Sequence, residues 1–201
     1  MNIHRHLLRI AMLFALVALL CAGLSAQEKK SAPASGFQGE FTTLISQVQG
    51  QIMDLEAAIP QEKMNWRPAE GVRSIGEVYL HLSWANYFVL KLAGYAPPAD
   101  ADFAMDAKKW EGQTSDKAKI ASIMKRSFEH VVATGAAVSN ADLEKKVNVF
   151  GTEMSVRAAL MVTLSHLHEH LGQSIAYARS NGVVPPWTAA QQKKEAEQMK
   201  K

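Results

Sequence analysis

The segment Ser165-His166-Leu167-His168-Glu169-His170 gathers three histidines that could do chemistry. His166 and His170 are four residues apart, which on an α-helix is about one turn, or roughly 6 Å along the axis. Both imidazoles then project from the same face and can bind one ion together. His168 lies two residues from each of them, on nearly the opposite side, so we expect it at a solvent-facing or rim position.

Two imidazoles rarely hold a divalent transition metal alone, so a third ligand must come from another part of the chain. His81 is the natural candidate, because the apolar residues Val78, Ala85 and Phe88 mark its side of a helical segment as inward-facing. Three neutral imidazoles with one open coordination position form a site that supports catalysis. A buried histidine is often only a hydrogen-bonded core residue, so a bundle without metal is the alternative. His130 is expected, like His168, to face solvent or the rim.

Further polar side chains continue the two histidine-bearing faces. Gln173 and Tyr177 follow the histidine pair at helical spacing, and Glu77 precedes the third histidine by one turn. Such groups can orient a ligand or hold a water molecule, so these three are the candidates for a catalytic role. Glu77 has a competing explanation, because Ser74-Ile75-Gly76-Glu77 is the pattern of a capping box at a helix start.

Four stretches with apolar residues at helical spacing must position these side chains. They run from about 37 to 59, 74 to 92, 115 to 138 and 155 to 180. Four amphipathic helices hide their apolar stripes most economically around one axis, so we expect an all-α four-helix bundle. Aromatic residues near the histidines should form core or pocket wall: Trp66, Trp84, Tyr87 and Phe88.

The connections between these helices carry weaker signals. The stretch 95–114 is long enough to cross the end of the bundle between the second and third helices, so a crossover is expected. We expect no convincing strand, apart from a short extended piece near 147–150. The charged tail 189–201 is interpreted as a frayed helix that follows the bundle domain of residues 37–188.

Residues 1–26 have the pattern of a secretory signal peptide. Arg5 and Arg9 make its start basic, an apolar run covers 10–20, and small residues lead to Ala26. The run is shorter than the roughly 20 residues that span a bilayer, although a retained anchor is an alternative. The sequence therefore predicts an exported protein, periplasmic or secreted, without a stable membrane anchor after cleavage.

Cleavage after Ala26 leaves a polar lead-in at 27–36 and removes the only cysteine, Cys21. The mature chain then has no disulfide and no cysteine nucleophile. Lipid attachment at Cys21 is disfavoured, because bulky Leu20 precedes it where a lipoprotein signal has a small residue.

Composition narrows the class of protein. The chain has 201 residues, of which 48% are hydrophobic and 20% charged, enough for one well-buried core and incompatible with a disordered chain. Lys and Arg number 22 against 19 Asp and Glu, and removal of Arg5 and Arg9 leaves 20 against 19. A nearly neutral mature chain argues against a nucleic-acid partner, which would require clustered basic residues.

Short motifs throughout residues 37–187 resemble the DinB-like family. The first half of the chain carries Asn65-Trp66-Arg67-Pro68, Arg73-Ser74-Ile75-Gly76-Glu77, His81-Leu82 and Asn86-Tyr87. The second half carries His166, His170, Gly172-Gln173, Tyr177, Arg179 and Gly182-Val183-Val184-Pro185-Pro186.

This resemblance implies a four-helix bundle, commonly with a crossover between the second and third helices, and a divalent metal held by His81, His166 and His170. Imidazole suits several transition metals, and zinc or nickel is favoured here. The resemblance also implies a homodimer as an option. Thiol-dependent S-transferases and a mycothiol-dependent isomerase occur in this family, but their thiol cofactors are cytosolic, which disfavours thiol transfer by an exported protein.

Two functional hypotheses follow. The first is a metal-dependent hydrolase or transferase that acts on a small molecule, and the second is a noncatalytic protein that binds a metal or a small ligand. A metal-free structural bundle and a DNA-damage factor are further alternatives; near-neutral charge and export disfavour DNA. The sequence carries no serine-nucleophile motif, phosphate loop or dinucleotide fingerprint that would narrow the substrate.

Overall fold

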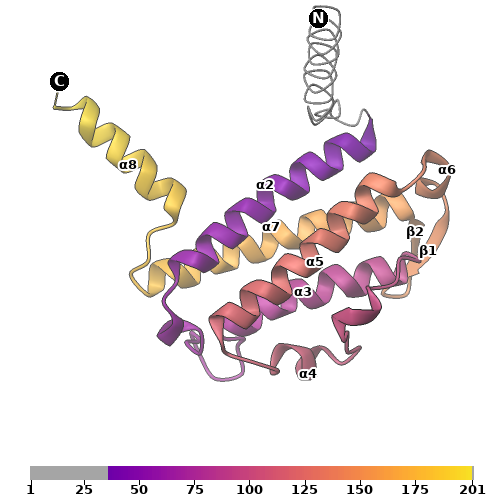
Figure 1. Cartoon of the computed structure of the whole chain (residues 1–201), viewed down its shortest axis with the longest axis horizontal. Coiled ribbons are helices and arrows are strands. Elements are labelled where there is room, and N and C mark those ends of the chain that lie inside the picture. Colours follow the sequence, from indigo (N-terminus) through magenta and orange to yellow (C-terminus); the bar gives the residue numbers. More distant parts are fainter. Residues whose placement is uncertain (1–35, 201) are drawn as a thin grey trace, which may run out of the picture. The chain divides into compact units, whose positions relative to one another are not determined.

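The computed structural model describes residues 36–200, and four long helices form its bundle (Figure 1). These helices are α2 (Phe37–Ala58), α3 (Ile75–Leu92), α5 (Lys117–Ala137) and α7 (Val156–Ser180). The all-α four-helix bundle is confirmed, and each predicted helix end lies within two residues of the observed one. The predicted signal peptide, Cys21 and nearly all of the lead-in lie outside the described residues.

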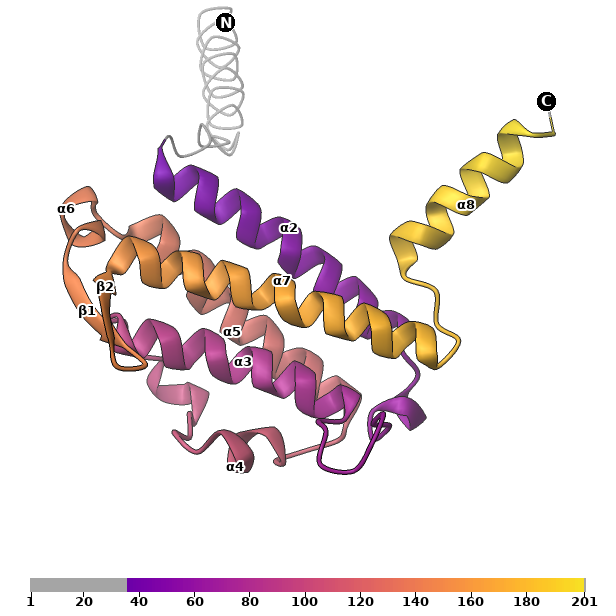
Figure 2. The same cartoon turned by 180° about the vertical axis from the view of Figure 1, so that it is seen from behind.

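The order of the helices around the bundle requires a long return of the chain. α2 and α3 each pack against both α5 and α7, so α2 lies diagonally across from α3. α3 and α5 run in one direction, whereas α2 and α7 run in the other (Figures 1 and 2). The chain between α3 and α5 must therefore travel back along the bundle, which is the expected crossover between the second and third helices.

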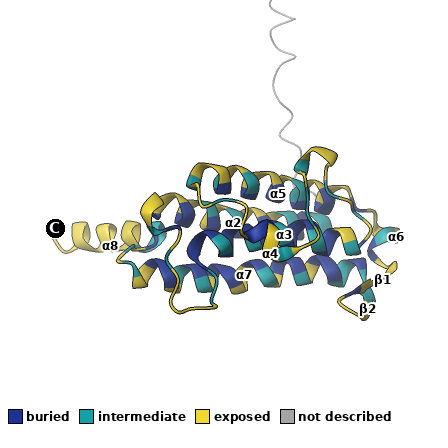
Figure 3. Cartoon of the chain, turned by 90° about the horizontal axis from the view of Figure 1, so that it is seen from below, coloured by how far each residue is buried: buried dark blue, intermediate teal, exposed yellow. Residues whose placement is uncertain are grey.

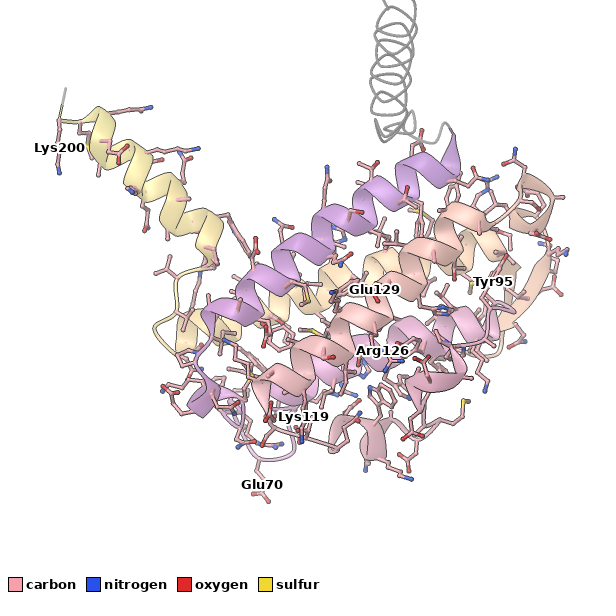
Figure 4. All side chains as sticks on the ribbon, viewed as in Figure 1. Glu70, Tyr95, Lys119, Arg126, Glu129 and Lys200 are labelled. Carbon is pink, nitrogen blue, oxygen red and sulfur yellow. The ribbon has the colours of Figure 1, made fainter. Side chains whose placement is uncertain are left out.

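Specific contacts hold this crossover against the bundle. It contains two short helices, η3 (Ala99–Ala101) and α4 (Ala107–Glu111). Trp110 of α4 is buried, and its indole N–H donates a 2.9 Å hydrogen bond to Ser83 Oγ on α3. Arg126 on α5, labelled in Figure 4, forms an ion pair with Asp100 at 2.6 Å. The end of α4 is thus fixed beside α3.

A β-hairpin joins α5 to α7: its first strand confirms the short extended piece expected near 147–150, whereas its second strand was not expected. The chain between α5 and α7 forms α6 (Asn140–Leu143), β1 (Lys146–Val149) and β2 (Thr152–Ser155). One further short element, η2 (Gln61–Lys63), lies between α2 and α3. The strands pair antiparallel, with Val149 opposite Thr152. Phe150 and Gly151 connect them, and both have positive φ, as a type I′ turn requires. Four-residue strands are too short to show a clear alternation in the sequence.

The core is formed by the inward faces of the four bundle helices (Figure 3). On α2, for example, Phe41, Ile45, Val48 and Ile52 recur at helical spacing and are fully buried. By contrast, α8 (Pro186–Gln198) is almost wholly exposed and begins three residues before the tail expected from the sequence. Within residues 36–200, none of the helices combines the length and apolarity needed to cross a bilayer.

Candidate metal centre

The three histidines singled out by spacing converge between α3 and α7, which pack side by side. His81 comes from α3, and His166 and His170 come from successive turns of α7. The Nε2 atom of His166 lies 3.2 Å from Nε2 of His81 and 3.1 Å from Nε2 of His170. All three potential ligand atoms lie within 4.8 Å of one another.

These separations match those between ligands of a single ion. Nitrogen atoms that bind zinc at 2.0–2.1 Å are about 2.9 Å apart at a 90° angle and about 3.4 Å apart at a tetrahedral angle. The observed 3.1 and 3.2 Å lie between these two values. His166 is therefore placed to share one ion with either neighbour, and the three ligand atoms, all within 4.8 Å of one another, could hold a metal ion together.

Hydrogen bonds behind the triad fix which nitrogen carries the proton in two of the three rings. His81 Nδ1 lies 2.7 Å from Glu111 Oε1, and His170 Nδ1 lies 2.7 Å from Gln173 Oε1. Carboxylate and amide oxygens only accept, so both Nδ1 atoms donate and both Nε2 atoms keep a free lone pair. A proton on His166 Nε2 could be donated to only one of its two neighbours, His81 or His170, whereas a cation between the rings could bind the lone pairs of all three Nε2 atoms.

Glu111 is held in place by a second partner. Arg73 Nε donates to Glu111 Oε2 at 2.8 Å, and Arg73 Nη2 donates to Glu111 Oε1 at 3.0 Å. The side chain of Glu111 is only 10% exposed, and its two oxygens accept hydrogen bonds from Arg73 and His81. This paired geometry fixes the carboxylate that orients His81.

Sequence reasoning missed Glu111. It ends α4, a helix of five residues in the crossover, and lies 30 positions from His81 along the chain. No spacing rule connects the two residues, because the crossover brings them together only in the folded protein. The buried neighbour Trp110 is the one local signal that this part of the loop is packed against the bundle.

Burial favours neutral rings at this site. It lowers the pKa of His166 to about 3, and the nearby histidines and Arg73 act in the same direction. Burial and the charge of Arg73 also lower the pKa of His81, although the hydrogen bond that His81 donates to Glu111 opposes them. At neutral pH both rings are therefore uncharged, the charge state that binds metal.

The three polar candidates from the sequence have different surroundings. Gln173 orients His170 and donates through Nε2 to the Tyr177 hydroxyl at 3.0 Å, so these two residues form a chain behind the triad. Glu77 accepts from the backbone N–H of Ser74 at 2.7 Å and from Arg67 Nη2 at 3.0 Å. Its carboxylate completes the capping box of α3.

The other two histidines lie away from the triad. His168 is exposed, as expected, and its Nδ1 donates to the carbonyl of Leu164 at 3.0 Å. His130 is half-buried rather than solvent-facing, because its ring packs against Tyr87 with centroids 5.5 Å apart. Burial lowers the pKa of His130.

Aromatic side chains form the wall beside the triad. The Trp84 ring stacks on His81 with centroids 6.1 Å apart, and Phe88 stacks on Trp84 at 4.3 Å. Trp84 and Phe88 are half-buried, whereas Tyr87 is in the core. Trp66 packs edge-on against Tyr177 at 5.4 Å, behind the His170 side of the site.

Comparison with known proteins identifies the family. A sequence model of the DinB superfamily matches residues 44–174, which is well over half of the chain. The chain belongs to the DinB superfamily. The matched range includes all three histidines of the triad as well as Glu111 and Gln173. No protein with a curated description matches the sequence.

Solved structures share the DinB-like fold. A DinB-like protein from Bacillus cereus is 20% identical, with a TM-score of 0.63, over 75% of this chain and 98% of its own. The DinB-like protein YjoA from Bacillus subtilis is 18% identical, with a TM-score of 0.55, over 71% and 92%. A conserved protein from Enterococcus faecalis is 10% identical, with a TM-score of 0.59, over 73% and 97%.

The role of Glu111 can be tested against that of Glu77. Glu111→Gln keeps the size of the side chain but removes the charge that pairs with Arg73 and strengthens the hydrogen bond to His81. We expect zinc affinity to fall about 10- to 100-fold, the usual effect of losing a group that orients a metal ligand. The affinity is measured by competition with a chromophoric chelator.

Glu77→Gln is the matched control, because glutamine also supports a capping box. It should bind zinc like the parent protein. Equal zinc affinity in the parent and Glu111→Gln, or equal losses in both variants, would show that Glu111 does not act specifically on His81.

Proposed function

We propose that this DinB-superfamily protein binds one divalent transition metal through His81, His166 and His170 and acts on a small molecule outside the cytoplasm. The observation that supports this best is the set of three facing Nε2 atoms, two of them on rings whose Nδ1 protons are already donated. Three imidazole ligands with tetrahedral-compatible spacing favour zinc, with nickel as the next choice.

Hydrolysis or group transfer fits the surrounding side chains. A bound divalent ion supplies Lewis acidity, which activates water or polarises a substrate oxygen. Glu111 and Gln173 hold two of the imidazoles in a fixed orientation. Arg73 is 39% exposed, and its Nη1 makes no hydrogen bond within residues 36–200, so it is available to an anionic substrate group. The Tyr177 hydroxyl accepts from Gln173 and retains its own proton for donation.

One observation favours a noncatalytic binding protein instead. A general base needs a free basic atom within reach of the substrate. Both oxygens of Glu111 accept hydrogen bonds from His81 and Arg73, and both oxygens of Glu77 accept from Ser74 and Arg67. Neither carboxylate is free for proton transfer, which is compatible with a protein that only sequesters a metal or a small ligand.

Metal content and turnover together test the proposal. The parent protein should bind one zinc ion and hydrolyse or transfer a member of an ester, amide and thioester panel. His166→Ala should bind zinc more than about 100-fold more weakly, because loss of a ligand costs more than loss of an orienting group, and should lose turnover.

His168→Ala is the matched control, since it removes an exposed imidazole from the same helix and should keep both properties. Stoichiometric zinc without turnover across the panel would support the binding protein. Zinc retained by His166→Ala would contradict the proposed site.

We further propose that the chain is exported, with residues 1–26 as a cleaved signal, and that its partner is a small molecule rather than nucleic acid. A homodimer is compatible with this proposal. The support for export is the basic start, apolar run and small residues that end at Ala26.

Export is testable with a charge placed in the apolar run. The full chain produced in a Gram-negative host should yield a mature protein that begins at Gln27, identified by N-terminal sequencing of the periplasmic fraction. Leu16→Arg should leave the precursor uncleaved, because a charge in the apolar run prevents recognition. Ala32→Arg, in the lead-in, should be processed normally. A full-length parent chain in the membrane fraction would instead indicate a retained anchor.

A further inference from the structure

Three aromatic rings extend from the triad toward the β-hairpin, and we call Trp84, Phe88 and Phe150 the aromatic ladder. Trp84 stacks on the ring of His81, and Phe88 stacks on Trp84 with an interplanar angle of 16°. Phe150, at the hairpin turn, continues the series with its centroid 5.7 Å from that of Phe88. One end of the ladder thus stacks on a candidate ligand of the metal centre.

The stability of the fold does not explain why a phenylalanine occupies position 150. Its side chain is 65% exposed, so burial contributes little. Its φ of 54° lies in the left-handed region, where Asn or Gly is favoured in a two-residue turn and a bulky side chain is disfavoured. An exposed aromatic residue in an unfavourable conformation, placed against Phe88, points to contact with something outside the chain.

The other side of the triad offers a positive charge. Arg73 contacts Glu111 through Nε and Nη2, and Glu111 contacts His81, so only the Glu111 side chain separates the guanidinium from the triad. Its Nη1 makes no hydrogen bond to any residue in the described part of the chain. Two N–H donors therefore remain for an anionic group, and guanidinium is well suited to a carboxylate.

We propose that the site takes a carboxylate with a flat aromatic body, whose head group binds at the triad and Arg73 and whose body lies along the aromatic ladder. This inference rests on the proposed metal-dependent function and names its ligand class. From His81 to Phe88 the helix rises about 10 Å, a length that suits a body of two fused or linked rings. Because the Trp84 ring stacks on His81 and on Phe88, the body would meet ring edges, and edge-to-face contacts would give aromatic bodies an advantage over aliphatic ones of equal charge.

Two carboxylates with the same head group separate the contribution of the ladder from that of the metal. Calorimetric titration of zinc-loaded protein with 2-naphthoate and with acetate should show 2-naphthoate binding at least about tenfold more tightly. Phe150→Asn should weaken 2-naphthoate about three- to tenfold and leave acetate unchanged. Its zinc affinity should equal that of the parent, and its melting temperature should not fall, because Asn tolerates positive φ.

Leu44→Asn is the matched control, since Leu44 is an exposed apolar residue on α2, diagonally across the bundle from α3. It should bind both carboxylates like the parent. Equal affinities for 2-naphthoate and acetate would overturn the inference. An unchanged 2-naphthoate affinity in Phe150→Asn would also overturn the inference. This holds even if sedimentation shows that the variant has lost a dimer formed by the parent.

A separate zinc titration distinguishes failure of the metal from failure of the ladder. If the parent does not bind zinc, the proposed function fails, and 2-naphthoate is then titrated into the zinc-free protein. Binding that weakens in Phe150→Asn would still support the aromatic ladder. Absent binding, or binding independent of Phe150, would overturn it.

Discussion

Three nitrogen lone pairs that face one another at 3.1 and 3.2 Å repel unless a positive charge lies between them. The Nδ1 protons of His81 and His170 are donated to Glu111 and Gln173, so only a proton on His166 Nε2 could relieve the repulsion, and it reaches one neighbour at a time. A cation between the three rings would relieve the repulsion at all three nitrogens. Under the proposed function, metal binding would therefore also stabilise the bundle.

The crossover is what makes the arrangement complete. An up-down-up-down bundle could place histidines on α3 and α7, but its short loops would bring no carboxylate to the outer side of α3. Here the chain returns along the bundle between α3 and α5, and buried Trp110 fixes α4 so that Glu111 meets His81. The topology and the candidate site are thus linked: the same segment that reverses the helix order also orients a ligand.

Local rules predicted those parts of the protein that repeat along a helix. The four helices, the triad and the position of Gln173 follow from apolar periodicity and from spacings of three or four residues. Glu111 and Arg73 could not be assigned in this way, since their contact joins a loop helix to the start of α3. Only the first strand of the hairpin was predicted, as a short extended piece, because the strands have four residues each and Phe150 occupies a turn position where sequence rules expect Asn or Gly. Glu77 was correctly given a capping alternative by the Ser74 pattern.

X-ray absorption spectroscopy of the zinc-loaded protein counts the imidazoles around the ion without relying on activity. We expect three imidazole nitrogens at about 2.0–2.1 Å and one oxygen ligand. A spectrum with fewer than three imidazoles, or with carboxylates as the principal ligands, would contradict this expectation.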